Sequence, residues 1–133
     1  MTNGLNPLIS VVDDDGSIRR TTTFLIESFG FRAAAFESAE EFLKSDVLPH
    51  TSCLIIDVQM PVMTGLQLQS KLAAAGCHMP IIFITAFDDS AARDRAMKAG
   101  AIAFLEKPFS DELLLQSVRS ALQHEDSGKK SAG

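Results

Sequence analysis

The stretch "CLIIDVQMPVMTG" (residues 53–65) leads four apolar residues straight into one carboxylate, Asp57, and then reaches a proline and a glycine. A short continuous apolar run is typical of a strand that is buried on both faces, as in a parallel sheet covered by helices. A charge at the end of such a strand lies at the edge of the sheet, at a position that the strand fixes. The stretch therefore raises the question of which chemistry needs a carboxylate there.

Short apolar runs and helical patterns alternate along the whole chain. The apolar runs predict five strands, at 8–12, 31–36, 52–56, 81–85 and 101–105. Amphipathic or capped segments predict helices at about 16–29, from Ser38 onward, and at about 65–75, 89–99 and 110–124. Five strands that alternate with helices indicate the α/β class, as a doubly wound (βα)5 sandwich.

The remainder of the chain sets the expected boundaries of one domain. Residues 1–7 are expected to be an N-terminal extension, and residues 8–124 to form the domain. Residues 125–133 are polar, small and glycine-containing, which predicts a disordered tail or the start of a linker. In the first part of the chain, "SAEE" predicts a capping box with Ser38 as N-cap and Glu41 at N3. Before the fourth helix, Asp88, Asp89 and Ser90 are capping candidates.

Composition narrows the class of protein. The net charge of −5 argues against nucleic-acid binding by this domain, because neutralising phosphates needs an excess of Lys and Arg. No apolar run reaches 18 residues and no signal-peptide pattern opens the chain, so we expect a cytoplasmic protein without a membrane span. Cys53 and Cys77 lack metal-ligand or redox spacing, which predicts buried structural thiols.

The residues that follow the predicted strands carry the chemistry. In a doubly wound sheet, ligands bind beyond the carboxyl ends of the strands. There the sequence places Asp13-Asp14-Asp15, Asp57, Thr85 and Glu106-Lys107-Pro108. Crowded carboxylates raise one another's pKa values or require a cation, and Mg²⁺ commonly takes one or two carboxylates with waters and a phosphate oxygen. A lysine and a hydroxyl at the same edge suit a tetrahedral anion such as phosphoryl.

Each of these features has an ordinary structural explanation when taken alone. An acidic cluster after a strand is often a turn or a helix cap, Thr85 fits a plain strand residue, and Lys107 fits a solvated lysine. Their convergence at one edge of the sheet is what favours a binding site.

Four segments, "VVDDDGSIRR", "LIIDVQMPVMTG", "IIFITAF" and "AIAFLEKPF", together resemble a two-component response regulator receiver domain of the CheY-like kind. The resemblance covers about residues 8–124. It implies a flavodoxin-like fold, with a five-stranded parallel sheet in the order 2-1-3-4-5 and helices on both faces. The sequence "EKPF" and the sequence of the first predicted helix also resemble the branch of response regulators whose members often carry a LuxR-type DNA-binding output domain.

The resemblance implies a metal and phosphoacceptor site. Asp57 would accept the phosphoryl group, and Asp13 and Asp14 would form the acidic pocket for Mg²⁺ (or Mn²⁺). Asp14 would contact the metal directly and Asp13 through water, while Asp57 and the backbone carbonyl of Gln59 would complete the protein ligands. Asp15, one residue past the matched pair, is expected to cap the first helix.

The same resemblance implies a switch. Thr85 and Lys107 would each bind a phosphoryl oxygen, and the Lys107–Pro108 peptide bond would be cis. Phe104 would be the aromatic residue that rotates inward when Thr85 moves; simple core packing on the fifth strand is the alternative. Gln59 and Phe87, two residues past Asp57 and Thr85, would tune the lifetime of the phosphoryl group; Phe87 is otherwise a surface turn aromatic.

The implied function is signalling rather than enzymatic turnover, with autophosphotransfer and autodephosphorylation as the only activities. A sensor histidine kinase or a histidine phosphotransfer protein would donate the phosphoryl group. The output would be transcription if the chain belongs to a longer regulator, or a protein contact if it stands alone. Homodimerisation on phosphorylation, through helices 1 and 5 or helices 4 and 5, is a further expected partner mode.

Three alternatives remain at this point. A Mg²⁺-dependent aspartyl-phosphate hydrolase of the haloacid dehalogenase type needs a second acid two residues after the nucleophile, where this chain has Gln59. A flavodoxin-like cofactor binder needs a Ser/Thr/Gly-rich phosphate loop, where this chain has "DDDGS" (13–17). A receiver fold without a switch would be a protein-binding scaffold.

Overall fold

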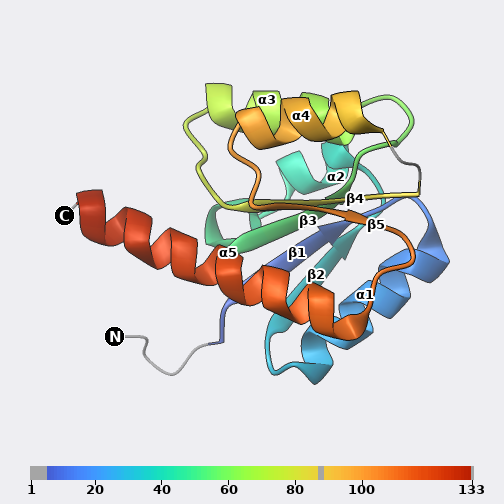
Figure 1. Cartoon of the computed structure of the whole chain (residues 1–133), viewed down its shortest axis with the longest axis horizontal. Coiled ribbons are helices and arrows are strands. Elements are labelled where there is room, and N and C mark those ends of the chain that lie inside the picture. Colours follow the sequence, from blue (N-terminus) through green and yellow to red (C-terminus); the bar gives the residue numbers. More distant parts are fainter. Residues whose placement is uncertain (1–5, 87–88, 133) are drawn as a thin grey trace.

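Strands and helices alternate in the order that the sequence predicts (Figure 1). The computed structural model describes residues 6–86 and 89–132. The elements are β1 (Leu8–Val12), α1 (Gly16–Ser28), β2 (Arg32–Phe36), α2 (Ala39–Lys44), a 3-10 turn η1 (Leu48–His50), β3 (Cys53–Asp57), α3 (Gly65–Ala74), β4 (Ile81–Thr85), α4 (Ser90–Lys98), β5 (Ala103–Glu106) and α5 (Asp111–Ala132).

The five strands form one parallel sheet in the order β2-β1-β3-β4-β5, which confirms the predicted fold. Helices α1 and α5 cover one face, and α2, α3 and α4 cover the other (Figure 1). Side chains alternate between two cores: Ile55 of β3 packs with α1 and α5, whereas Ile56 packs on the opposite side. Every residue of β1, β3 and β4 is buried, as their continuous apolar runs predict.

Strands β2 and β5 begin later than predicted, for one physical reason. The N–H groups of Phe31 and Ala101 donate to the carbonyls of Ile26 and Ala96, which lie in the last turns of the preceding helices. These bonds belong to the helix C-caps, so Phe31 and Ala101 complete a helix end and do not open a strand. Strand β2 therefore starts at Arg32 and β5 at Ala103.

Helix starts follow side-chain caps, with one change in the predicted pattern. Asp15 accepts from the N–H groups of Ser17 and Ile18, as predicted, and Asp89 caps α4; Asp88 lies outside the described residues. Ser38 caps α2, but the Glu41 carboxylate accepts from the N–H of Glu37 instead of closing the predicted box on Ser38.

Sequence reasoning missed a complete capping box at the start of α3. Thr64 and Gln67 each accept from the other's backbone N–H. The pattern Thr-x-x-Gln before an apolar run was the available signal.

Helix α5 extends to Ala132 and so includes residues 125–132 of the segment predicted to be a disordered tail or the start of a linker; the boundary of the domain at residue 124 stays a prediction. The segment contains no proline that would stop the helix, and its single Gly128 is tolerated at moderate cost.

Within the described part of the chain, no helix is long and apolar enough to cross a membrane. The two cysteines differ from the prediction in part, since Cys53 is buried but Cys77 only half-buried.

Candidate functional site

Three carboxylates meet at the carboxyl end of the sheet. Strand β1 delivers Asp13 and Asp14, and β3 ends at Asp57. One carboxylate oxygen from each of them lies within 4.8 Å of the others. Asp13 and Asp57 are buried, whereas Asp14 is exposed. The cluster is therefore anchored in the core on one side and open to solvent on the other.

Lys107, which follows β5, balances this negative charge. Its Nζ donates to Asp57 Oδ2 at 2.9 Å and to Asp13 Oδ2 at 3.4 Å, and its side chain is only 15% exposed. Strand β4 helps to place it, because the Lys107 N–H donates to the Thr85 carbonyl at 2.7 Å. The lysine is thus a bridge between two carboxylates, which explains why it is not a solvated surface residue.

The second oxygen of each buried carboxylate is held by its own loop. Asp57 Oδ1 accepts from the N–H of Gln59 at 2.8 Å, and Asp13 Oδ1 accepts from the N–H of Asp15 at 2.9 Å. Each carboxylate is therefore fixed in rotation by one backbone donor and has its other oxygen directed at the lysine. Such preorganised orientation is what a reacting or metal-binding carboxylate requires.

Burial and charge shift the pKa values of two of these groups. Burial raises the pKa of the Asp13 carboxyl, and the nearby charge of Asp57 adds to that effect, more than the Asp15 N–H and Lys107 lower it. For Lys107, burial alone would lower the pKa, but the hydrogen bond and charge of Asp57, together with Asp13, outweigh it and raise the pKa above its ordinary value. Lys107 therefore stays charged at neutral pH.

The donor set fits a hard divalent cation. All three candidate side-chain ligands are carboxylates, the type that Mg²⁺ and Mn²⁺ prefer, and none is a soft sulfur ligand. Mg²⁺ holds its oxygens at about 2.0–2.1 Å, so ligands across the ion stand about 4 Å apart. The three carboxylate oxygens lie within 4.8 Å of one another, near enough to share one ion, and the exposed Asp14 leaves room for the waters that Mg²⁺ retains.

Arg19 is a site neighbour that sequence reasoning missed. Its Nη1 donates to the backbone carbonyl of Asp13 at 2.8 Å, and its Nη2 lies 3.9 Å from Glu37 Oε2. The guanidinium therefore braces the acidic loop from α1 and ties it to the end of β2. A basic residue one turn into the helix after the three aspartates was the only sequence signal.

Gly65 is a close backbone neighbour of Asp57. A Cβ at this position would lie 2.6 Å from the Asp57 carbonyl oxygen, 3.0 Å from the Phe83 ring and 3.1 Å from the Val58 Cα. The Gly65 N–H also donates to the Val58 carbonyl at 3.0 Å. The glycine is therefore required by close approach, and it fixes where the chain turns after the phosphoacceptor candidate.

Replacing Gly65 by alanine should lower the free energy of unfolding by about 2–3 kcal/mol, because two of the atoms in the way belong to the backbone and cannot rotate aside. Urea denaturation measures this change, and the amide NMR signal of Gln59 reports displacement of the Asp57 carboxylate. Gly76→Ala is the matched control, since no atom lies within 4 Å of a Cβ there and only its φ of +78° opposes alanine. It should cost about 1 kcal/mol and leave the Gln59 signal in place. Equal losses in both variants would contradict the steric account.

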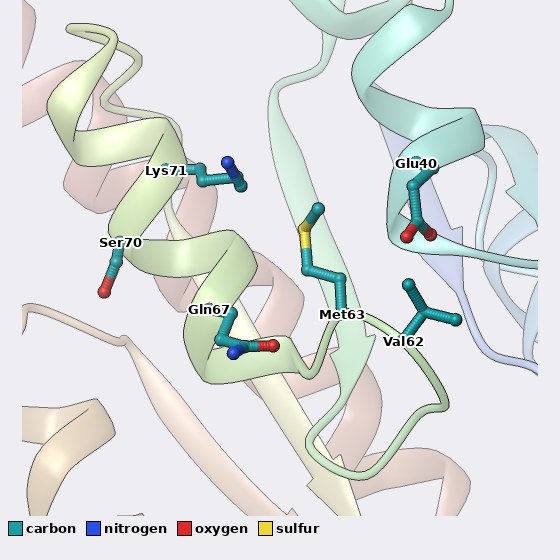
Figure 2. A pocket seen from close by; sticks show the side chains of 6 residues that line it. All are labelled: Glu40, Val62, Met63, Gln67, Ser70 and Lys71. Atoms are coloured by element: carbon teal, nitrogen blue, oxygen red, sulfur yellow. The ribbon is translucent and has the colours of Figure 1, made fainter.

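The loop between β3 and α3 contains a strained residue. Val62 has a φ of +70° and is 89% exposed, and the Met63 N–H donates to the Pro61 carbonyl across it at 2.8 Å. This is a γ-turn with positive φ, which a β-branched residue adopts at a cost. Figure 2 shows Val62 at the loop, beside Glu40 of α2 and next to the groove of about 400 Å³ that Met63, Gln67, Ser70 and Lys71 also line.

Val62→Gly should raise the free energy of unfolding by about 0.5–1 kcal/mol, because the relief of positive-φ strain exceeds the added freedom of the unfolded chain. The exposed side chain contributes little burial, so its loss should not offset the gain. Val62→Ala keeps the strain and should change stability by less than about 0.5 kcal/mol. The midpoints of urea denaturation of Val62→Gly and Val62→Ala measure this difference in stability. A glycine variant that is no more stable than the alanine variant would show that the turn is unstrained.

Two further predicted site residues, Thr85 and Phe104, lie on β4 and β5. Thr85 is buried at the end of β4, beside Glu106 in the β4–β5 register. Phe104 is 8% exposed, and its ring centroid lies 6.1 Å from that of Phe83, within the core on the α2–α4 face. The Lys107–Pro108 peptide bond is cis. Phe87 lies outside the described residues.

Comparisons with known proteins agree with this geometry. Residues 9–119 match the family described as the response regulator receiver domain. Nodulation protein W of Bradyrhizobium diazoefficiens is 46% identical over 118 residues, covering 89% of this chain and 52% of that protein. Transcriptional regulatory protein FixJ of Azorhizobium caulinodans is 40% identical over 114 residues, covering 86% of this chain and 54% of that protein.

A solved structure has the same fold as this chain. That of response regulator StyR superposes with a TM-score of 0.88 at 40% identity, over 96% of this chain and 64% of that one. The chain spans about half the length of the curated relatives it matches.

Proposed function

The chain belongs to the response regulator receiver domain family, and from that premise we propose that Asp57 accepts a phosphoryl group and that its phosphorylation switches the domain. Phosphorylation-dependent switching is the family's role. The observation that carries the assignment to Asp57 is that its Oδ2 makes the shorter contact with the Lys107 ammonium, 2.9 Å against 3.4 Å for Asp13 Oδ2, while its Oδ1 is held by the Gln59 N–H. Asp57 is thus a buried, oriented carboxylate at the sheet edge where ligands bind.

The acidic cluster would hold the cation of this site. Receiver domains bind Mg²⁺ at an acidic pocket, and here Asp13, Asp14, Asp57 and the backbone carbonyl of Gln59 would hold Mg²⁺ or Mn²⁺. The bound cation supplies neutralisation of charge on the phosphoryl oxygens during transfer. Arg19 holds the Asp13 backbone, so the acidic loop needs little rearrangement to bind the ion.

The phosphodonor would be a phosphohistidine of a sensor kinase or of a histidine phosphotransfer protein. The phosphorus–nitrogen bond of the donor breaks as a bond forms between phosphorus and an Asp57 oxygen, and the leaving imidazole takes up a proton. Lys107 then exchanges its carboxylate contact for a phosphoryl oxygen, and the Thr85 hydroxyl binds another. These steps make the chain a signalling phosphoacceptor with autophosphotransfer and autodephosphorylation activity.

The output follows from the change around Thr85. Movement of the Thr85 side chain toward the phosphoryl group would let Phe104 change its packing, which couples the site to the face formed by α4, β5 and α5. Gln59 is exposed two residues past Asp57 and would limit the approach of water. Phe87, two residues past Thr85 in the sequence, would have the same effect.

We propose residues 8–124 as the receiver unit, controlling transcription in a longer regulator. The lengths of the matched relatives support this proposal, and phosphorylation-induced homodimerisation would transmit the signal.

Labelling with acetyl phosphate tests the proposed function. Wild-type protein should gain a single adduct of roughly 80 Da by intact mass when Mg²⁺ is present, and none after chelation by EDTA. Circular dichroism in both conditions confirms that the fold is intact without the metal. A folded, Mg²⁺-loaded protein that never gains the adduct would instead be a scaffold that keeps the fold without the switch.

A further inference from the structure

We propose that Arg93 of α4 is a positioning residue that holds the ring of Phe104 in its buried orientation. The guanidinium carbon of Arg93 lies 5.3 Å from the centroid of the Phe104 ring. This inference rests on the proposed function, in which Phe104 changes its packing when Thr85 moves. It adds Arg93 to the residues, Thr85 and Phe104, that the proposed switch already includes.

The packing around Phe104 leaves part of its ring for the Arg93 guanidinium to cover. On one side the ring meets Phe83, its register partner on β4, at 6.1 Å between centroids. On the helix side, the α4 residues in the same core are Ala92 and Ala96, whose side chains are too short to cover an aromatic ring fully. Arg93, next to Ala92, supplies the missing cover with its long side chain and planar head group.

Among the residues that the structure describes, the guanidinium of Arg93 contacts the ring of Phe104 without a competing ion pair. Over residues 6–86 and 89–132, its side chain makes no ion pair within 4.0 Å and no side-chain hydrogen bond. The residue as a whole is exposed, yet its guanidinium lies over the ring. Within the described part of the chain, the ring of Phe104 is therefore the contact that orients the Arg93 side chain.

The expected size of the effect follows from measured cation–π interactions. At exposed sites they favour the stacked state by a factor of about two to five. Arg93 should therefore multiply the ratio of buried to exposed Phe104 rings by that factor before any phosphorylation. A ligand that favours the buried Phe104 ring binds the population of molecules in which the ring is already buried. Removing Arg93 reduces that population, so such a ligand should bind more weakly, by at most the same two- to fivefold factor.

The composition of the chain makes the ring observable. The sequence contains no tryptophan and no tyrosine, so Phe104→Trp introduces a single indole whose acrylamide quenching reports its exposure. In this background, Arg93→Met should raise the accessible fraction of the introduced indole by about two- to fivefold. Arg95→Met is the matched control, with the same helix and the same loss of charge, and should leave quenching unchanged. Arg93→Lys should recover part of the protection.

A second measurement uses the native ring. The NMR signals of the Phe104 ring should shift in Arg93→Met but not in Arg95→Met, which covers the case in which Phe104→Trp does not fold. Beryllofluoride with Mg²⁺, a phosphoryl mimic, should then bind Arg93→Met more weakly by a factor of up to about five. Ring signals that respond equally to both substitutions would overturn the role of Arg93. If beryllofluoride and acetyl phosphate both fail to act on wild type, the proposed function itself fails, independently of Arg93.

Discussion

Asp57→Asn should reduce phosphoryl labelling by acetyl phosphate to background, while wild type gains the adduct of roughly 80 Da. An amide lacks the anionic oxygen that attacks phosphorus, so no step of the transfer can begin. The fold should survive the change, because the amide oxygen can still accept from the Gln59 N–H and Lys107 keeps its contact with Asp13. Intact mass measured in parallel on both proteins gives the result.

Asp94→Asn is the matched control for this substitution. Asp94 is exposed on α4, away from the acidic cluster, and the variant makes the same chemical change. It should label as wild type does. If Asp57→Asn still gains the adduct, peptide mapping would locate a different phosphoacceptor, and the assignment made from the sheet edge would be wrong.

Lys107→Met should lower the free energy of unfolding by about 3 kcal/mol at pH 7, because it leaves two buried carboxylates without their shared cation. Asp13 and Asp57 side chains are 0% and 9% exposed, so water replaces little of the lost interaction. Urea midpoints at constant m value measure the change. Lys98→Met, an exposed lysine on α4, should change stability by less than about 0.5 kcal/mol.

The pH dependence of the Lys107→Met variant has a definite sign. Burial and the charge of Asp57 already raise the pKa of the Asp13 carboxyl in the folded state, and loss of the lysine removes an interaction that lowers it. The contribution of Asp13 to stability is then fully present below its unfolded pKa, near pH 4, and is lost as the pH rises through the folded value. The deficit relative to wild type should therefore shrink on acidification. Mg²⁺ should also reduce it, since the cation binds only the folded site.

A companion substitution separates repulsion from lost packing. Asp13→Asn combined with Lys107→Met removes one of the two opposed charges and should recover much of the stability lost at pH 7. If Lys107→Met is as stable as Lys98→Met at neutral pH, the bridge between the two carboxylates contributes nothing measurable.

Sequence reasoning reached the sheet and the composition of the site because both depend on local patterns and topology. Continuous apolar runs identified the buried strands, and the end of each strand then placed Asp13, Asp57, Thr85 and Lys107 at one edge. The switch geometry was less accessible. The stacking of Arg93 on Phe104 depends on how one helix is rotated above one strand, and no periodicity in a single segment encodes that rotation.

The sequence did not predict smaller details that depend on competing local rules or on tertiary distances. Ala101 belongs to an apolar run that resembles a strand, but its N–H completes the cap of α4. Gly65 carries a positional requirement only because the Asp57 carbonyl passes 2.6 Å from where a Cβ would stand, which is a tertiary distance. Arg19 followed the aspartates by one helical turn, yet only the structure shows that it donates to the Asp13 carbonyl.

The bridge formed by Lys107 joins residues that are synthesised far apart in time, because its partners lie far from it in the sequence. Its two carboxylate partners precede it by 94 and 50 residues, so the charge balance of the site depends on the last strand of the domain. At about 5–20 residues per second, the interval between synthesis of Asp57 and of Lys107 is roughly 3–10 s. During that interval a nascent chain carries the carboxylate without its lysine, so we expect Asp57 to accept no phosphoryl group before β5 has emerged from the exit tunnel and joined the sheet.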